Sequence, residues 1–301
     1  MPIVTRFLTA ALSLLLLTSP GFAPIGARTM HVGADAKPAL WVVRDSDTTI
    51  YLFGTIHVLR PDIRWFHGPV KQAFDKSGTL VVEVVTPDAQ AVAATTARLA
   101  LDPDGPPLTD KLDAPTRARY LALLSKVGLM QAQLDPFQPW FAAVSLSIAP
   151  LEKLGYRPDY GVEEVLKKAA AQGRKPVTAL EKMDEQLGFF ASLPEPVQLR
   201  FLTATIADAE KAETEIARMV TEWSAGHPAA LAEDMNDSLK DMPEIADALL
   251  YQRNRHWAAW IKERMAQPGT VFVAVGAGHL AGKGSVLDEL AARGMKVRRV
   301  E

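Results

Sequence analysis

Apolar runs near the two ends of the chain predict β-strands. Close to the N-terminus, "ALWVVRDSDTTIYLFGTIHVL" holds two β-rich runs around the polar turn Asp45-Ser46-Asp47, which is the pattern of a β-hairpin. The following run, "SGTLVVEVV", is almost continuously apolar and is typical of a buried strand. Near the C-terminus, "TVFVAVG", "SVLDELAARG" and "KVRRVE" predict a strand, a helix and a strand in that order.

The middle of the chain has a different period. From about residue 115 to 265, apolar positions recur at helical spacing, and Pro and Gly separate the amphipathic runs. One short strand candidate, "KPVTAL", interrupts them. Strands that are distant in sequence can be neighbours in one sheet. We therefore expect an α/β fold with a mixed central sheet built from the N- and C-terminal strands and a large helical insertion between them.

The first 27 residues are predicted to be a signal peptide and a short linker. Arg6 precedes an apolar run from Phe7 to Leu17, and small residues suited to cleavage follow near Ala23 or Ala27. The apolar run is too short to span a bilayer comfortably, although an uncleaved anchor is the alternative. We expect a periplasmic protein with no stable membrane span after cleavage. Residues 28–301 are expected to form a single domain.

Composition narrows the classes of function. The chain of 301 residues is 48% apolar and 23% charged, which is enough to bury a substantial core. Its formal charge of −2 and the absence of a long basic block argue against nucleic acid as a partner. It contains no cysteine, which excludes disulfides, a thiol nucleophile and Cys-ligated metals. Export without cysteine fits a bacterial periplasm.

Two predicted strands, at opposite ends of the chain, each run into Gly-x-x-His. The first motif ends at His57 and the second at His279. Groups just past strand ends line the usual ligand crevice of open α/β sheets, so the two histidines could meet there. Glu83 lies within "LVVEVV", where an ionised carboxylate is costly to bury unless it meets a cation or donors. Together the three side chains predict a two-His, one-carboxylate site for a hydrolytic divalent metal.

Simpler interpretations exist for each of these residues. A single histidine at a strand end is more often a hydrogen-bonded structural residue than a ligand, and Glu83 could belong to a buried ion pair. His31, His67, His227 and His256 lie in segments without the motif, and we expect them to be surface or structural residues.

The second motif also overlaps a dinucleotide-binding pattern. "GAGHLA" matches G-x-G-x-x-A after a strand, and Glu301 falls about where an acid would contact a ribose. Only one βαβ unit is present, however, and the next helix is predicted to begin near Ser285. "AGKG" is not a P-loop, because Gly284 stands where Ser or Thr must bind magnesium. We therefore favour the metal site over a nucleotide site.

Several segments together resemble one known family. They are "LWVVRD…TTIYLFGTIHVL", "LVVEVV", "PVTALEKMDEQLGFF", "LLYQRNRHWAAWI" and "VFVAVGAGHLAGKGSVLDELAARGMKVRRV". From about Leu40 to the C-terminus the chain resembles the TraB/GumN family, which is related to the Tiki proteins. The resemblance implies a fold shared with the erythromycin esterase and ChaN-like groups. Through Tiki it also implies a metal-dependent peptidase activity, with manganese or cobalt favoured over zinc.

Carried across by motif, the family's site residues correspond to His57, Glu83, His279, Arg253 and Asn254. The resemblance thus implies a metal-dependent hydrolase, most simply peptidase-like, acting on a peptide or small-molecule substrate outside the cytoplasm. If only two of the three ligands bind metal, the third is left as general base. Arg253 would stabilise an oxyanion or hold a substrate carboxylate, unless it and Asn254 only make an interhelical polar contact.

Two further acids have open roles. Glu163 in "YGVEEVL" stands where the family pattern has an aspartate, and Glu181 after "PVTAL" could join the site or simply favour a helix N-terminus. The alternative function is a non-catalytic periplasmic protein that binds haem or a peptide, since histidine is a common axial ligand of haem. The sequence does not specify the substrate, nor amide against ester hydrolysis.

Overall fold

The computed structural model describes residues 35–239 and 241–300. The predicted signal peptide, His31 and Glu301 lie outside these residues. Within them, no helix has the length and apolar character needed to cross a membrane.

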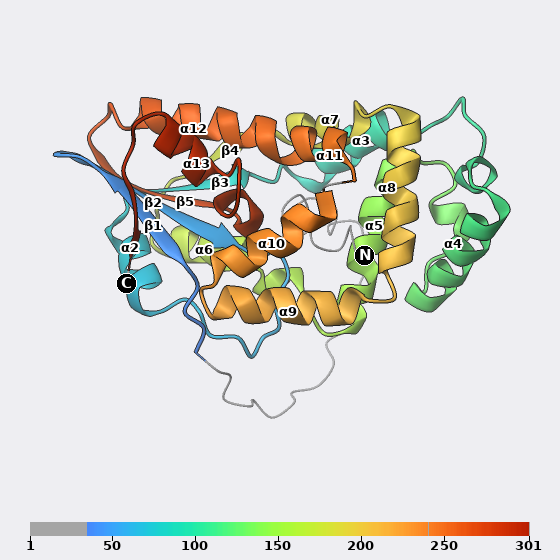
Figure 1. Ribbon diagram of the computed structural model, residues 1–301, viewed down its shortest axis with the longest axis horizontal. Helices are drawn as coiled ribbons and strands as arrows, with labels where there is room; N and C mark the ends of the chain where they lie inside the picture. The colour runs from blue at the N-terminus through green and yellow to red at the C-terminus, as the bar shows by residue number, and fades with distance from the viewer. Residues whose placement is uncertain (1–34, 240, 301) are drawn as a thin grey trace.

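The described strands form one six-stranded mixed sheet, in the order β4-β3-β5-β2-β1-β6 (Figure 1). The strands are β1 (Leu40–Arg44), β2 (Thr48–Thr55), β3 (Thr79–Val84), β4 (Val177–Glu181), β5 (Gly269–Gly276) and β6 (Val297–Val300). The four strands from β4 to β2 run parallel to their neighbours, while β1 is antiparallel to both β2 and β6. The predicted α/β fold is therefore confirmed, with strands from both ends of the chain side by side.

The predicted hairpin joins β1 and β2. The Asp45 carboxylate accepts hydrogen bonds from the backbone N–H groups of Asp47 and Thr48, at 3.2 and 2.9 Å. A short acidic side chain that bonds to the backbone two or three residues ahead is a common way to close a turn. This local bond fixes where the first strand reverses.

Helices fill most of the rest of the chain. They are α2 (Gly68–Lys76), α3 (Ala89–Ala100), α4 (Ala114–Val127), α5 (Pro139–Lys153), α6 (Val162–Gln172), α7 (Met183–Ala191), α8 (Glu195–Asp208), α9 (Ala212–Ser224), α10 (Pro228–Leu239), α11 (Pro243–Ala246), α12 (Gln252–Arg264) and α13 (Val286–Ala292). Shorter turns are η2 (Leu108–Lys111), η3 (Gln131–Gln133), η4 (Pro158–Tyr160), η6 (Ala277–Leu280) and the π-helical η5 (Asp247–Tyr251). Helices α2 and α3 precede residue 115, so helical structure begins earlier than the sequence pattern predicted.

Helices cover both faces of the sheet. On one face, α12 and α13 pack through residues such as Trp257 and Leu290 against the side chains of Ile50 and Val273. On the other face, α2, α6 and α9 cover Phe53 and the neighbouring strands. Because both faces are buried, the parallel strands are apolar almost throughout, which explains the continuous runs in the sequence.

A helical lobe extends beyond the strand ends. Helices α3, α4, α5, α7, α8 and α11 share a separate core, in which Trp140 stacks on Phe190 with ring centroids 5.6 Å apart. In Figure 1 this lobe lies on the side toward which the arrows of β2 and β5 point. The helical insertion therefore stands next to the carboxyl ends of the parallel strands, where ligand sites of open α/β sheets are usually found.

Strand register brings the two Gly-x-x-His motifs together. In the β2–β5 pair, Gly54 lies opposite Val275 and Thr55 lies opposite Gly276. Strand β3, which carries Glu83, pairs with the other edge of β5. The motifs thus leave the sheet side by side, with the strand glutamate on the neighbouring strand.

Candidate active site

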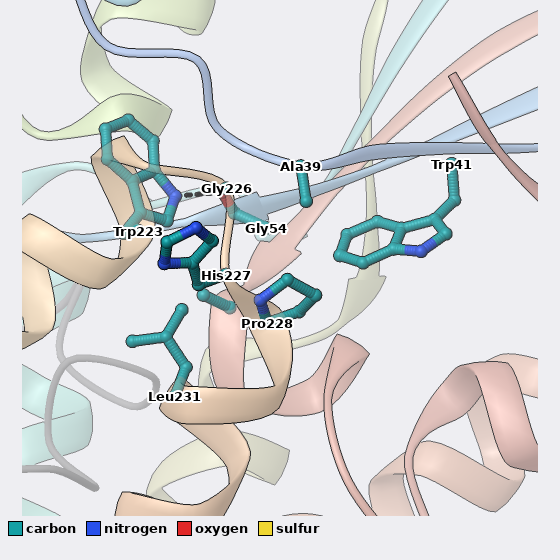
Figure 2. Close-up of a pocket in the computed structure, with 9 residues that line it drawn as sticks. Ala39, Trp41, Gly54, Trp223, Gly226, His227, Pro228 and Leu231 are labelled. Atoms are coloured by element: carbon teal, nitrogen blue, oxygen red, sulfur yellow. Dashed lines mark hydrogen bonds between the residues drawn. The ribbon is translucent and has the colours of Figure 1, made fainter. Parts of the chain in front are cut away.

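The first glycine of the repeated motif permits close contact between the two motifs. A Cβ atom on Gly54 would lie 3.0 Å from the Cα of Ala277, which is closer than neighbouring backbone normally allows. On the other side, Trp223 donates its indole N–H to the Gly54 carbonyl at 2.8 Å, beside a small apolar cavity (Figure 2). Glycine is therefore required here for packing.

His57 is paired with Glu163 from helix α6. Its Nδ1 lies 2.7 Å from the Glu163 Oε1, and both side chains are buried. Thr55 also donates its hydroxyl to Glu163. The helix can approach because its N-cap is Gly161, where a Cβ would lie only 2.0 Å from the His57 carbonyl oxygen. Glu163 thus has a definite partner, which the sequence left open.

Glu163 is held in its ionised form. Burial by itself raises the pKa of a carboxyl, but the charge of His57 and the hydrogen bonds from His57 and Thr55 outweigh it, so the pKa of Glu163 lies below its usual value. Glu163 also sits in the first turn of α6, where the helix dipole favours a negative charge. A carboxylate on Nδ1 fixes the imidazole tautomer and orientation.

A second network is centred on Arg253 of α12. Its Nε and Nη2 donate to the two oxygens of Glu181 at 2.8 and 2.9 Å, and Nη2 also donates to Glu83 at 2.7 Å. Its Nη1 donates to the Leu249 carbonyl and to His279 Nε2, both at 3.2 Å. A guanidinium has five N–H bonds, and these five contacts use all of them. Glu83 and Glu181 raise the pKa of Arg253 despite the opposing effect of burial.

Glu83 is surrounded by donors. Besides Arg253, the Gln186 amide donates to Oε2 at 3.1 Å and the backbone N–H of Gly276 donates to Oε1 at 2.6 Å. Burial raises the pKa of Glu83, while the charges of Arg253 and His57 act against that rise. The strand glutamate that looked costly to bury is therefore compensated by one cation and two neutral donors.

His279 completes the same network as a neutral imidazole. Its Nδ1 lies 2.7 Å from Asn254 Oδ1, and the Asn254 amide in turn donates to the Gly284 carbonyl. Nδ1 is therefore the protonated nitrogen, and Nε2 accepts from Arg253. Burial, together with the charges of Arg253 and His57, puts the pKa of His279 well below its usual value. The ring also packs on Trp257, with centroids 4.4 Å apart.

The two networks are neighbours, because Thr55, which donates to Glu163, lies opposite Gly276, which donates to Glu83. The charge of protonated His57 accordingly acts on the pKa of both Glu83 and His279. The structure thus brings the five residues expected from sequence into one region: Glu83, Arg253, Asn254 and His279 share direct contacts, and His57 is beside them. All five are at most 4% exposed. The cluster is therefore closed off from solvent.

The sequence did not identify several participants. The sequence leaves the roles of Glu163 and Glu181 open, and no motif in it singles out Thr55 or Gln186. Gln186 is fully buried, and its Oε1 has no hydrogen-bond partner among the described residues. The only sequence signals were the polar residues themselves, because α6 and α7 are brought to the strand ends by tertiary packing. By contrast, His227 and His256 are exposed and His67 is partly exposed, in keeping with the expectation of surface or structural residues.

The side chains in this arrangement do not fit a divalent metal. The donor types are suitable, but His279 Nε2 and Glu83 Oε2 both face the guanidinium of Arg253, and Glu83 Oε1 is bonded to Gly276. In the described part of the chain, no three His, Asp or Glu side chains are grouped as metal ligands. Haem fits no better, because it needs a broad apolar slot and these histidines lie among carboxylates and a guanidinium.

The dinucleotide interpretation also finds no support in this geometry. Strand β5 is followed by the short turn η6 rather than by a long helix, and α13 begins only after its N-cap Ser285. His279 in this turn bonds to Asn254 and Arg253. The Gly-rich segment therefore contributes His279 to the buried cluster and does not form a nucleotide-binding turn.

Fold and site together define an α/β protein with a buried ionisable cluster at the carboxyl ends of parallel strands. A sequence model of the TraB/PrgY/gumN family matches residues 39–299, so the chain belongs to this family. The expectation drawn from the motifs is thus confirmed at the level of the family.

Individual relatives are distant but cover most of the chain. This chain is 25% identical over 249 residues to the uncharacterized protein YbaP of Escherichia coli K12, and the match covers 83% of this chain and 90% of that protein. The YbaP protein of Shigella flexneri matches with the same identity and coverage. An uncharacterized protein of Treponema pallidum is 24% identical, covering 82% of this chain and 78% of the relative. No solved structure matches at a comparable level of significance.

Proposed function

We propose that this chain is a peptidase-like hydrolase that acts outside the cytoplasm, with His57 as its general base. The observation that carries the proposal is the buried His57–Glu163 pair, 2.7 Å between Nδ1 and Oε1, at the carboxyl end of a central parallel strand. A histidine oriented by a carboxylate is a recurring arrangement for activating a nucleophile. The signal-peptide pattern of residues 1–27 supports the proposed periplasmic location.

In the proposed reaction, His57 activates water. In its neutral form, His57 donates Nδ1–H to Glu163 and keeps a lone pair on Nε2, which takes a proton from the attacking water. The water oxygen then bonds to the substrate carbonyl carbon, the carbon–nitrogen bond breaks, and the proton passes from His57 to the departing nitrogen. Glu163 stays ionised and stabilises the imidazolium that forms in between.

The Arg253 network would support this reaction by holding neighbouring residues in place, and not by contacting the substrate. All five donors of Arg253 are already used, so an oxyanion could bind it directly only by displacing a partner. We therefore assign Arg253, and Asn254 through His279, as positioning residues. The Gln186 Oε1, buried beside Glu83, is an acceptor that a peptide N–H could use. This acceptor favours a peptide as substrate.

A peptide screen tests the proposal. The purified chain is incubated with a peptide library, with and without manganese, and products are identified by mass spectrometry. We expect cleavage by the wild type and by His256→Gln, an exposed control on the helix that carries Arg253, and none by His57→Gln. Peptide binding without cleavage would instead support the alternative of a non-catalytic peptide-binding protein. A Soret band in the purified protein would support haem binding.

A further inference from the structure

The guanidinium of Arg253 occupies the place where a metal was expected. It lies between a strand carboxylate and a motif histidine, with Nη2 2.7 Å from Glu83 Oε2 and Nη1 3.2 Å from His279 Nε2. These are two of the three groups that the sequence indicated as metal ligands. A cation is already bound to both of them, and it belongs to the chain itself.

The surroundings of the guanidinium are complete. Glu181 accepts hydrogen bonds from Nε and Nη2 in a two-point contact, the side-by-side geometry that a planar guanidinium offers to a carboxylate. The guanidinium carbon lies 4.7 Å from the Trp257 ring centroid and 5.6 Å from that of Phe189, both suitable for cation–π contact. The Arg253 side chain is 1% exposed. Both charge and shape are therefore matched to Arg253.

The π-helical turn η5 and the side chain of Asn254 hold the hydrogen-bond partners of Arg253 in place. The π-helical turn η5 ends just before α12, and its Leu249 carbonyl accepts from Arg253 Nη1. Such widened turns are frequent at functional sites. Asn254 accepts from His279 Nδ1–H and so holds the tautomer whose Nε2 accepts a hydrogen bond from Arg253. The Arg-Asn pair thus places the guanidinium and prepares its histidine acceptor.

We propose that Arg253 is the resident cation of this site, standing in place of a divalent metal, and that Glu83 and His279 bind no metal in the wild-type chain. The inference deepens the proposed function, because it assigns a metal-independent hydrolase, but its test does not depend on catalysis.

Metal binding is measured on the full chain by equilibrium dialysis against Mn²⁺, Co²⁺ and Zn²⁺, followed by elemental analysis. We expect no stoichiometric metal at this site. One equivalent of metal in the wild type, lost in both Glu83→Gln and His279→Gln, would overturn the proposal. Metal that both variants retain lies elsewhere and supports it. Absence of peptide cleavage, with no metal bound at the site, would reject the hydrolase function alone.

Chemical rescue provides a second test. Arg253→Ala leaves a space lined by Glu83, Glu181 and His279, and we expect methylguanidinium to raise its melting temperature saturably, with no such rise for the wild type or for Arg255→Ala. A folded Arg253→Ala protein that shows no rise would contradict the proposal. If circular dichroism shows that this variant does not fold, the dialysis of the wild type decides the question.

Discussion

At the scale of single residues, the chemistry depends on which partner each ionisable group meets. His57 and His279 occur in the same Gly-x-x-His motif, yet His57 pairs with a carboxylate while His279 accepts from a guanidinium. A carboxylate favours the protonated imidazole, whereas a buried guanidinium disfavours it. The two histidines are therefore suited to different tasks: His57 can exchange a proton, and His279 fixes the position of its neighbours.

Glu163→Gln tests the first of these tasks. The change keeps the side-chain shape but removes the charge that stabilises protonated His57, so we expect kcat to fall about 10²-fold or more, with a smaller effect on KM. The pH–rate profile, measured on the peptide found by the screen, should shift its lower pKa downward, because neutral Gln no longer favours the imidazolium. An unchanged profile would show that Glu163 has only a structural role.

His279 can be tested through the pH dependence of stability. The unfolded state takes up a proton near the usual pKa of 6.5, and the folded state does not. The free energy of unfolding should therefore fall as the pH drops below that value, by up to about 1.4 kcal/mol per pH unit. Glu83 contributes in the opposite sense, because burial raises its pKa and the folded state then keeps a proton to higher pH.

Comparison with a variant separates the two contributions. Urea unfolding of the wild type and of His279→Gln is measured from about pH 8 to about pH 5. The advantage of the wild type should shrink toward low pH, since only the wild type has this imidazole to protonate on unfolding. A difference that is constant over this range would mean that His279 is not held neutral.

At the scale of elements, two glycines determine how closely the site can be assembled. Gly54 allows β2 to lie against η6, and Gly161 allows the N-terminus of α6 to lie against the loop after β2. Neither glycine has a positive φ, so the requirement is for space and not for an unusual backbone conformation. Both contacts join segments that are far apart in the sequence, so a hydrophobic pattern does not predict them.

Alanine substitutions compare these contacts directly. Gly161→Ala places a methyl group 2.0 Å from the His57 carbonyl oxygen and must shift α6, so it should reduce both melting temperature and hydrolysis. Gly54→Ala meets Ala277 at 3.0 Å and should cost less. Gly188→Ala, inside α7, is the control: its added Cβ would meet no other part of the chain within 4 Å, and it should stabilise by up to about 1 kcal/mol. Equal effects at all three positions would contradict this assignment.

The elements were more predictable than their contacts. Continuous apolar runs and the Asp45 turn identified the strands, because burial on both sheet faces leaves a local signal. Helices α2 and α3 were not predicted, and the partners of His57 and Arg253 could not be, because those contacts join residues far apart in the chain. Thr55 and Glu163 are 108 positions apart, and Arg253 and Glu83 are 170 apart. Such pairs depend on packing, which a hydrophobic pattern does not specify.

At the scale of the whole molecule, Arg253 links parts of the fold that are otherwise separate. It joins β3 through Glu83, β4 through Glu181 and the C-terminal motif through His279. Removing one partner of a buried ion pair typically costs about 3–5 kcal/mol, because the remaining charge is left uncompensated. The two ends of the chain and the helical insertion are thus stabilised through one side chain.

Arg253→Ala should therefore lower the free energy of unfolding by about 3–5 kcal/mol in urea titrations. The control is Arg255→Ala on the same helix, whose ion pair with Asp247 is about half exposed on both sides and should contribute little. Similar losses for the two variants would show that the buried network is not what stabilises the junction.

The proposed function assigns to His57 the proton transfer in a hydrolytic reaction at this buried cluster. The most direct measurement is kcat for peptide cleavage by the wild type, His57→Gln and His256→Gln under identical conditions. We predict a loss of about 10²–10⁴-fold for His57→Gln and no change for His256→Gln. Cleavage by His57→Gln at the wild-type rate would contradict this role of His57.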